Sequence, residues 1–376
     1  MLYQFIKRLD TETRLGQRII SHLIPERYRK KFSVRYKERS RTRMIRKVCR
    51  DRKAQVEDLF YTCLEHISPV TEPLALISQV PFSGGMLLNR LFDGHPEIHA
   101  RPHQLLIGYP EENRWPKIDL KDDPQHWFEM LFENTVFVFD YASSGHCRKI
   151  GEQQAFPFIF LTSLQREIFS RSLDSLPEVA LRSVFDAYMT SYFGAWLNNQ
   201  NGNGPKKCVT AYGPGLSMSE DNMQLFFEIY LDGRLISVVR DPYAWLMSAR
   251  KHEPEKYGDF EQALGLWEAD ARAMLRNREE YDDRVCIIRF EDLVGKTRTV
   301  MHHLAEFLEV EFVESLLVPT FNTFALKGHT TMQDRGHGKL DGPVQEDRQL
   351  TGRPEDIIER MSAETYPQVL SRALKF

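Results

Sequence analysis

The sequence is poor in cysteine and has no long apolar run. Its five cysteines, at positions 49, 63, 147, 208 and 286, include no C-x-x-C pair. Scattered cysteines of this kind supply neither a zinc site nor a disulfide framework, and they are typical of a reducing compartment. The longest apolar candidate near the N-terminus, residues 19–24, is interrupted by Ser21 and His22. We therefore predict no secretory signal and no membrane span, and we expect a cytoplasmic protein.

Two further motifs are absent from the sequence. The pattern G-x-x-x-x-G-K-[ST] does not occur, which disfavours ATP or GTP hydrolysis. The histidines at 95, 99 and 103 lack the spacing of metal ligands, so we predict no metal site. With 376 residues, of which 42% are hydrophobic, the chain is large enough for one α/β domain with extensions or for two small domains.

Charge is distributed very unevenly. Residues 1–55 hold 18 Lys and Arg against 5 Asp and Glu, whereas the remainder holds 32 against 48. Apolar residues recur with helical spacing over 1–25, so we predict a basic helical arm over 1–55, followed by the main domain over 56–376. Two interpretations remain open: the arm binds an anionic membrane surface or polymer, or it packs on the acidic body or on a second subunit. We see no nucleic-acid-binding module.

Apolar runs alternate with helical patterns along the main domain. The pattern predicts strands over 74–80, 135–141, 208–212, 235–239 and 285–289. It predicts helices over 85–92, 173–200, 220–231, 243–251, 260–280 and 297–308. Such alternation indicates an α/β fold with a parallel sheet that binds ligands at the carboxyl ends of its strands. Residues 105–206, which are rich in aromatics, are either an insertion that shapes a ligand site or simply more core. Residues 327–353 are predicted to form a long loop of the kind that often covers a site.

Two segments of the type strand, tight turn and helix carry the strongest functional signal. In the first, Ser83, Gly84 and Gly85 precede a helix, and small residues allow the backbone N–H groups to cradle a phosphate. In the second, Arg240 closes a strand and Ser248 follows eight residues later on the next helix. Together they indicate a ligand with two separated anionic groups. The alternative for Arg240 is pairing with a carboxylate.

At these segments the chain resembles the sulfotransferase family, whose members transfer a sulfuryl group from 3′-phosphoadenosine 5′-phosphosulfate (PAPS). The resemblance implies a P-loop-like three-layer fold, PAPS as the donor and 3′,5′-ADP as the product. It implies that residues 82–86 (Phe82, Ser83, Gly84, Gly85 and Met86) bind the 5′-phosphosulfate and that Arg240 and Ser248 bind the 3′-phosphate. Residues 287–293 resemble a late strand of the family, and the absence of a signal anchor indicates a cytoplasmic protein of bacterial type.

The sequence departs from the family pattern at three positions. Phe82 stands where Lys or Arg is usual, Met86 where Thr or Ser is usual, and Gln104 where a Glu is frequent. Because sulfuryl transfer depends on charge stabilisation, another cation would have to compensate, and the candidates are Arg90, Arg101 and Lys339.

The transfer also requires a base for the acceptor proton. We predict His103 as this base, with His99 as the second choice; the alternative is that both are structural.

We therefore expect a sulfotransferase that modifies a hydroxyl or amine, with a glycan or a lipid-linked sugar as the acceptor. Its partners would be the small-molecule donor and, through the arm, a membrane surface or a second subunit. The alternative, favoured by Phe82, Met86 and Gln104, is a catalytically impaired protein that binds a nucleotide or acts as a scaffold. A nucleotide kinase is a weaker alternative, because the P-loop lysine is missing.

Overall fold

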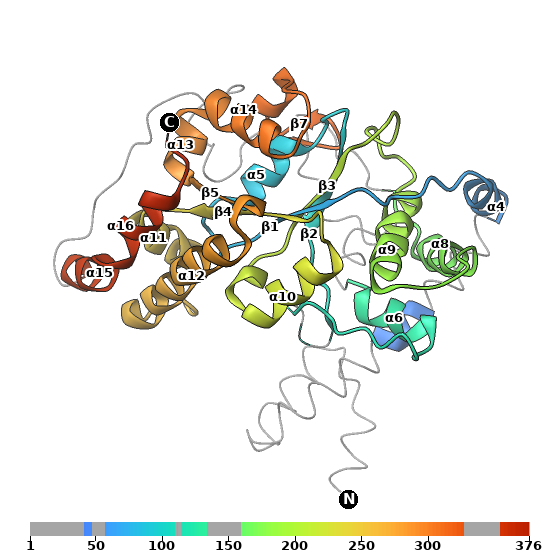
Figure 1. The fold of residues 1–376 in the computed structure, drawn as a ribbon, viewed down its shortest axis with the longest axis horizontal. Helices are drawn as coiled ribbons and strands as arrows, with labels where there is room; N and C mark the ends of the chain where they lie inside the picture. Colours follow the sequence, from blue (N-terminus) through green and yellow to red (C-terminus); the bar gives the residue numbers. More distant parts are fainter. Residues whose placement is uncertain are drawn as a thin grey trace, which may run out of the picture.

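The centre of the fold is a parallel sheet of five strands in the order β2-β3-β1-β4-β5 (Figure 1). This computed structural model describes residues 41–46, 57–109, 111, 114–133, 159–326 and 354–375. The strands are β1 Leu74–Ile77, β2 Ile98–Gln104, β3 Cys208–Tyr212, β4 Arg234–Val239 and β5 Val285–Arg289. A separate pair of short strands is formed by β6 Thr320–Phe321 and β7 Phe324–Ala325.

Alternate residues of the strands enter two separate hydrophobic cores. In β1, Leu74 and Leu76 belong to one core, whereas Ala75 and Ile77 belong to the other. Strand side chains point to opposite faces in turn, so the sheet is covered on both sides. The first core is completed by α9 Leu181–Ala195, α10 Glu220–Ile229 and α12 Phe260–Tyr281, and the second by α5 Gly85–Phe92, α13 Phe290–Gly295 and α14 Thr297–Phe307. The predicted three-layer α/β fold is therefore confirmed.

Strand β2 was not predicted, because its sequence is polar. It contains His99, Arg101 and His103, and Pro102 removes one ladder donor. Proline and irregular pairing are tolerated at the edge of a sheet, and the register of β2 against β3 shifts between Ala100 and Gln104. The strands predicted over 74–80, 208–212, 235–239 and 285–289 are present, and the one predicted over 135–141 lies outside the described residues.

A helix lies within the predicted span 173–200, but the predicted bounds are wrong because the chain breaks before it. The chain forms α8 Thr162–Asp174 and α9 Leu181–Ala195, with a turn between them that contains Pro177. Proline interrupts a helix because it lacks the N–H group and clashes with the preceding turn. The remaining helices are α4 Glu57–Glu65, α6 Pro124–Leu131, α11 Pro242–His252, α15 Pro354–Ser362 and α16 Thr365–Arg372. Among the described helices, none combines the length and the apolar character needed to cross a bilayer.

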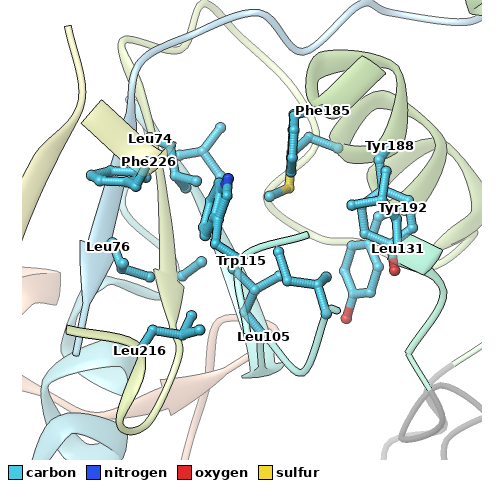
Figure 2. Close-up of a cluster of buried hydrophobic side chains, with 14 of the residues drawn as sticks. Leu74, Leu76, Leu105, Trp115, Leu131, Phe185, Tyr188, Tyr192, Leu216 and Phe226 are labelled. Atoms are coloured by element: carbon cyan, nitrogen blue, oxygen red, sulfur yellow. The ribbon is translucent and has the colours of Figure 1, made fainter. Parts of the chain in front are cut away.

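Much of the described part of residues 105–206 packs in the core beside the sheet (Figure 2). Trp115 is 1% exposed and stacks on Phe185 of α9, with ring centroids 5.2 Å apart. It also meets Phe226 of α10 edge to face, and its backbone N–H donates to Asn222 Oδ1 at 2.9 Å. The aromatic residues of this segment therefore extend the core that contains Leu74.

One piece of the basic arm lies against the body. Residues 41–46 form a helical turn in which Arg41 and Ile45 are buried. The Arg41 guanidinium donates to the carbonyl oxygens of Glu129 and Phe132 beside α6, and it lies 4.1 Å from the centre of the Tyr109 ring. The rest of the arm (1–40 and 47–55) and the predicted covering loop over 327–353 lie outside the described residues.

Candidate functional site

The loop 78–84 joins β1 to α5 at the carboxyl edge of the sheet. Its backbone carbonyls are held by the protein: Ser78 O accepts from the Ser237 hydroxyl at 2.9 Å, and Pro81 O accepts from the indole Nε1 of Trp245 at 2.8 Å. Helix α5 then begins at Gly85, and the N–H groups of a first turn have no carbonyl partner within the helix. This arrangement suits an anion. We call residues 82–86 the donor loop, after the sulfuryl donor that the resemblance assigns to it.

Both glycines of the donor loop are required by close packing. Gly84 has a φ of +104°, and a Cβ there would lie 2.3 Å from Cδ2 of Phe290. A Cβ at Gly85 would lie 1.8 Å from the end of the Gln79 side chain. With its amide turned to satisfy both neighbours, Gln79 accepts a hydrogen bond from the Gly85 N–H at 3.2 Å. The small residues thus let the loop backbone touch the residues beneath it.

Arg240 connects the second predicted segment to the donor loop. It follows β4, which pairs with β1, and its Nη1 donates to the carbonyl oxygen of Phe82 at 2.9 Å. Its guanidinium also lies 4.4 Å from the centre of the Phe290 ring. Burial lowers the pKa of Arg240, and Glu291 and Asp241 oppose that shift. The two segments, 158 residues apart in the sequence, therefore meet at one edge of the sheet.

Helix α11 begins at Pro242, one residue before the predicted start at residue 243. The Asp241 side chain caps it by accepting from the Ala244 N–H at 2.9 Å, and Pro242 occupies the first turn. Ser248 lies on α11, where it is partly buried. Its carbonyl oxygen is 2.8 Å from Nδ1 of His252.

Phe82 adopts a backbone conformation that is unusual for a side-chain-bearing residue. Its φ is +70°, in the left-handed region. Its ring stacks on His252, with centroids 5.3 Å apart and planes 20° from parallel, and it meets Tyr257 edge to face at 5.7 Å. The position at which the family usually carries a cation is therefore enclosed by aromatic rings from α11 and the segment that follows it.

The three basic residues considered as substitutes for that cation differ in placement. Arg101 is 1% exposed and forms a buried ion pair with Glu133, so the prediction that it serves the donor loop is wrong. Arg90 lies near the end of α5, with its guanidinium 4.7 Å from the centre of the Phe321 ring. Lys339 lies outside the described residues.

The two histidines predicted as bases lie at opposite ends of β2. His99 pairs with Val209, and Val209 also pairs with Leu74, the first residue of β1. His99 therefore lies at the amino edge of the sheet. It packs on Phe193, and burial lowers its pKa to about 4. His103 lies near the carboxyl edge, with its ring centroid 5.5 Å from that of Phe321. The structure thus keeps His103, and not His99, at the edge that carries the donor loop.

Two titratable groups near the donor loop were missed in the sequence. His252 stacks on Phe82, and the signal for it was its spacing of four residues after Ser248, which places both on one side of α11. Asp270 is 2% exposed in the middle of α12 and accepts a hydrogen bond from the Val80 N–H. A single aspartate within an amphipathic helix gave no signal, because its burial depends on the tertiary fold.

Asp270→Asn is expected to stabilise the protein more at pH 8 than at pH 5. Burial raises the pKa of Asp270 to about 7, so folding favours its protonated form. The stability that the buried, protonated Asp270 side chain contributes is fully present below the unfolded pKa of about 4. It is lost as the pH rises toward the folded pKa of about 7. Asparagine removes the ionisation, and we expect its advantage to grow by about 2 kcal/mol between the two pH values. Urea unfolding of both proteins measures this, and an equal difference at pH 5 and pH 8 would contradict it.

A model of the sulfotransferase family matches residues 75–314. The sulfotransferase domain from the curacin biosynthetic pathway is 18% identical, with 82% of this chain and 100% of that chain covered and a TM-score of 0.49. The sulfotransferase domain from the Synechococcus PCC 7002 olefin synthase is 21% identical, with 80% and 96% covered and a TM-score of 0.44. A sulfotransferase from Alicyclobacillus acidocaldarius is 15% identical, with 80% and 94% covered and a TM-score of 0.41.

A search among curated proteins gave no match. The family match spans the donor loop, the segment around Arg240 and β5. The strands of these three segments, β1, β4 and β5, are neighbours in the sheet. Because it covers well over half of the sequence, the chain belongs to the sulfotransferase family.

Proposed function

We propose that this protein transfers a sulfuryl group from PAPS to a hydroxyl or amine acceptor. The observation that carries the proposal is the hydrogen bond from Arg240 to the Phe82 carbonyl, which joins two anion-binding segments at the carboxyl edge of the sheet. A donor with a 5′-phosphosulfate and a 3′-phosphate requires two such segments at a fixed separation. After transfer the site would hold 3′,5′-ADP.

The proposal gives each group of the site a role. Backbone N–H groups of Ser83, Gly84 and Met86 would bind the 5′-phosphosulfate, with Gly85 joining them if its N–H exchanges Gln79 for the ligand, and Arg240 with the Ser248 hydroxyl would bind the 3′-phosphate. Two facts support this role for Arg240: its buried Nε has no hydrogen-bond partner, and no carboxylate of the described residues lies within ion-pair distance of it. A guanidinium has a planar fork of donors that suits a phosphate. The chemistry is direct in-line transfer by positioning and charge stabilisation, and it needs no metal.

The acceptor and the location are proposed from the sequence. We keep a glycan or lipid-linked sugar as the acceptor class and His103 as the sequence-based candidate for the base. We keep a cytoplasmic protein whose basic arm, residues 1–55, brings it to an anionic membrane surface or to a second subunit.

Calorimetric titration of the full-length protein with 3′,5′-ADP and with 5′-AMP tests the proposal. We expect binding of 3′,5′-ADP and at least about tenfold weaker binding of 5′-AMP, because 5′-AMP lacks the 3′-phosphate that Arg240 would bind. Incubation with sulfur-labelled PAPS and a panel of glycans, phenols and amines then identifies the acceptor class. Equal affinity for the two nucleotides, or no binding of either, would overturn the site assignment.

A second candidate function rests on Phe82. Because the donor loop carries an aromatic side chain where the family usually has a cation, the protein could bind the nucleotide without turning it over. Such a catalytically impaired protein would act through nucleotide binding or as a scaffold. Tight binding of 3′,5′-ADP combined with no consumption of labelled PAPS, with any acceptor or with water, would favour this alternative.

A further inference from the structure

Sulfuryl transfer to a hydroxyl or amine needs a group that takes the acceptor proton, and three described carboxylates lie near the donor loop. Asp241 caps α11, and Glu291 accepts from the Asp241 N–H at 3.0 Å. Asp270 is buried beneath the loop at Val80. The oxygens of Glu291 and Asp270 that lack a hydrogen-bond partner are buried, so an incoming acceptor cannot reach them, and Asp241 is engaged at the start of α11.

Among the described histidines, His252 has its ring stacked on a residue of the donor loop. It is exposed in the last turn of α11, and it stacks face to face on Phe82 with centroids 5.3 Å apart. The Phe82 carbonyl is in turn fixed by Arg240 at 2.9 Å. The imidazole is thus held against the first residue of the loop and at the same time remains open to solvent.

The hydrogen bond of His252 sets its tautomer. Its Nδ1 lies 2.8 Å from the carbonyl oxygen of Ser248, and a carbonyl oxygen only accepts hydrogen bonds. In the neutral ring Nδ1 therefore carries the hydrogen, and the lone pair is on Nε2. This is the tautomer of a proton acceptor whose second nitrogen is anchored by the protein backbone.

We propose that Nε2 of His252 takes the proton of the acceptor during sulfuryl transfer; the inference rests on the proposed function. The acceptor oxygen or nitrogen forms a bond to sulfur while its proton moves to Nε2. The bond between sulfur and the bridging oxygen breaks, and its electron pair leaves on the 5′-phosphate oxygen of 3′,5′-ADP. The imidazolium then releases the proton to solvent.

The placement of His103 makes it the weaker choice for this step. It belongs to β2, which is separated from β1 by β3, so the two strands lie about 10 Å apart. Its ring packs beside Phe321, and β2 lies on the other side of β1 from β4, the strand that precedes α11. His252, in contrast, touches the donor loop directly.

The experiment uses the full-length protein and sulfur-labelled PAPS with water as the acceptor, so that the natural acceptor need not be known. His252→Gln keeps a polar side chain of similar size that cannot take up a proton. We expect it to lower the rate of sulfate release by about 10²–10⁴-fold and to leave the Kd for 3′,5′-ADP within a few-fold of wild type. The matched control is His302→Gln, an exposed histidine on α14 beside Glu306. A wild-type rate in His252→Gln, or a large loss in His103→Gln alone, would overturn the proposal.

Two further readouts separate a proton acceptor from a structural histidine. The wild-type rate should fall toward low pH as the imidazole becomes protonated, and this acidic limb should be absent in His252→Gln. Added imidazole should restore part of the activity of His252→Ala. An acidic limb that persists unchanged in His252→Gln would contradict the role.

The tautomer can be measured without any turnover. Long-range ¹H–¹⁵N correlation spectra of protein labelled at histidine, assigned with His252→Gln, should show the Nδ1–H form. A predominant Nε2–H form would overturn the inference whatever the activity.

The outcomes distinguish the two proposals. If the wild-type protein does not bind 3′,5′-ADP, the proposed function fails. If the wild-type protein binds 3′,5′-ADP and releases sulfate, and His252→Gln does the same, only the assignment of His252 fails.

Discussion

Arg240→Ala is expected to weaken 3′,5′-ADP binding by about 10–150-fold, because charge-assisted hydrogen bonds contribute about 1.5–3 kcal/mol. The change removes the donors proposed for the 3′-phosphate. It also removes the bond from Nη1 to the Phe82 carbonyl at 2.9 Å, which holds the donor loop. In addition, the partly buried carboxylates of Glu291 and Asp241 lose a nearby positive charge, which disfavours an anionic ligand further. Isothermal titration calorimetry of both proteins measures the loss.

The matched control for this prediction lies at the other end of the same strand. Arg234 opens β4, where it donates to the carbonyl oxygen of Phe307 and pairs with Glu309 far from the donor loop. Arg234→Ala changes net charge by the same amount and should leave nucleotide affinity nearly unchanged, because exposed charges contribute little through solvent. Arg240→Lys keeps the charge without the planar fork, so it should fall between wild type and Arg240→Ala. Equal affinity in wild type and Arg240→Ala would show that the 3′-phosphate binds elsewhere.

Arg101→Met is expected to destabilise the fold by about 3–5 kcal/mol, since it leaves a buried carboxylate without its partner. Arg101 and Glu133 are 1% and 0% exposed at their side chains. Glu133 also accepts from the Tyr188 hydroxyl and from the Leu106 N–H, both at 2.9 Å, so the carboxylate is fixed in place and cannot move to solvent. The Arg101 guanidinium lies 4.0 Å from the centre of the Tyr192 ring, a contact that methionine only partly replaces. Urea unfolding monitored by tryptophan fluorescence gives the difference.

A second substitution distinguishes lost charge pairing from lost packing. Arg101→Met combined with Glu133→Gln removes both charges; the glutamine oxygen can accept from the Leu106 N–H, and its NH2 group can donate to the Tyr188 hydroxyl oxygen. We expect the double variant to recover more than half of the lost stability, because replacing a buried ion pair by neutral groups costs far less than breaking it. A double variant as unstable as Arg101→Met would mean that packing around Tyr192, and not charge, sets the penalty.

The elements predicted well are those whose signals are local. The apolar runs of β1 and β4 are buried on both faces and therefore continuous in the sequence. The start of α11 follows from Asp241 and Pro242 alone, because an N-cap and a first-turn proline act on their immediate neighbours. Strand β2 and the break between α8 and α9 were missed or misplaced. The former depends on pairing with β3. The latter had a local signal in Pro177, which the hydrophobic pattern of 173–200 outweighed in the prediction.

The sequence by itself determined the fold class, the two strand–turn–helix segments that we predict to bind anions, and the family to which they point. Each of these rests on residues close together in the chain, where backbone chemistry fixes the local structure. The tertiary structure decided which charges are available to a ligand. It places Arg240 against the donor loop but buries Arg101 against Glu133, although both are arginines at sheet strands. It also brings His252 into contact with Phe82, although the two residues are 170 positions apart in the sequence. Burial and long-range contacts depend on how the layers pack, and a single sequence does not encode them in any local pattern.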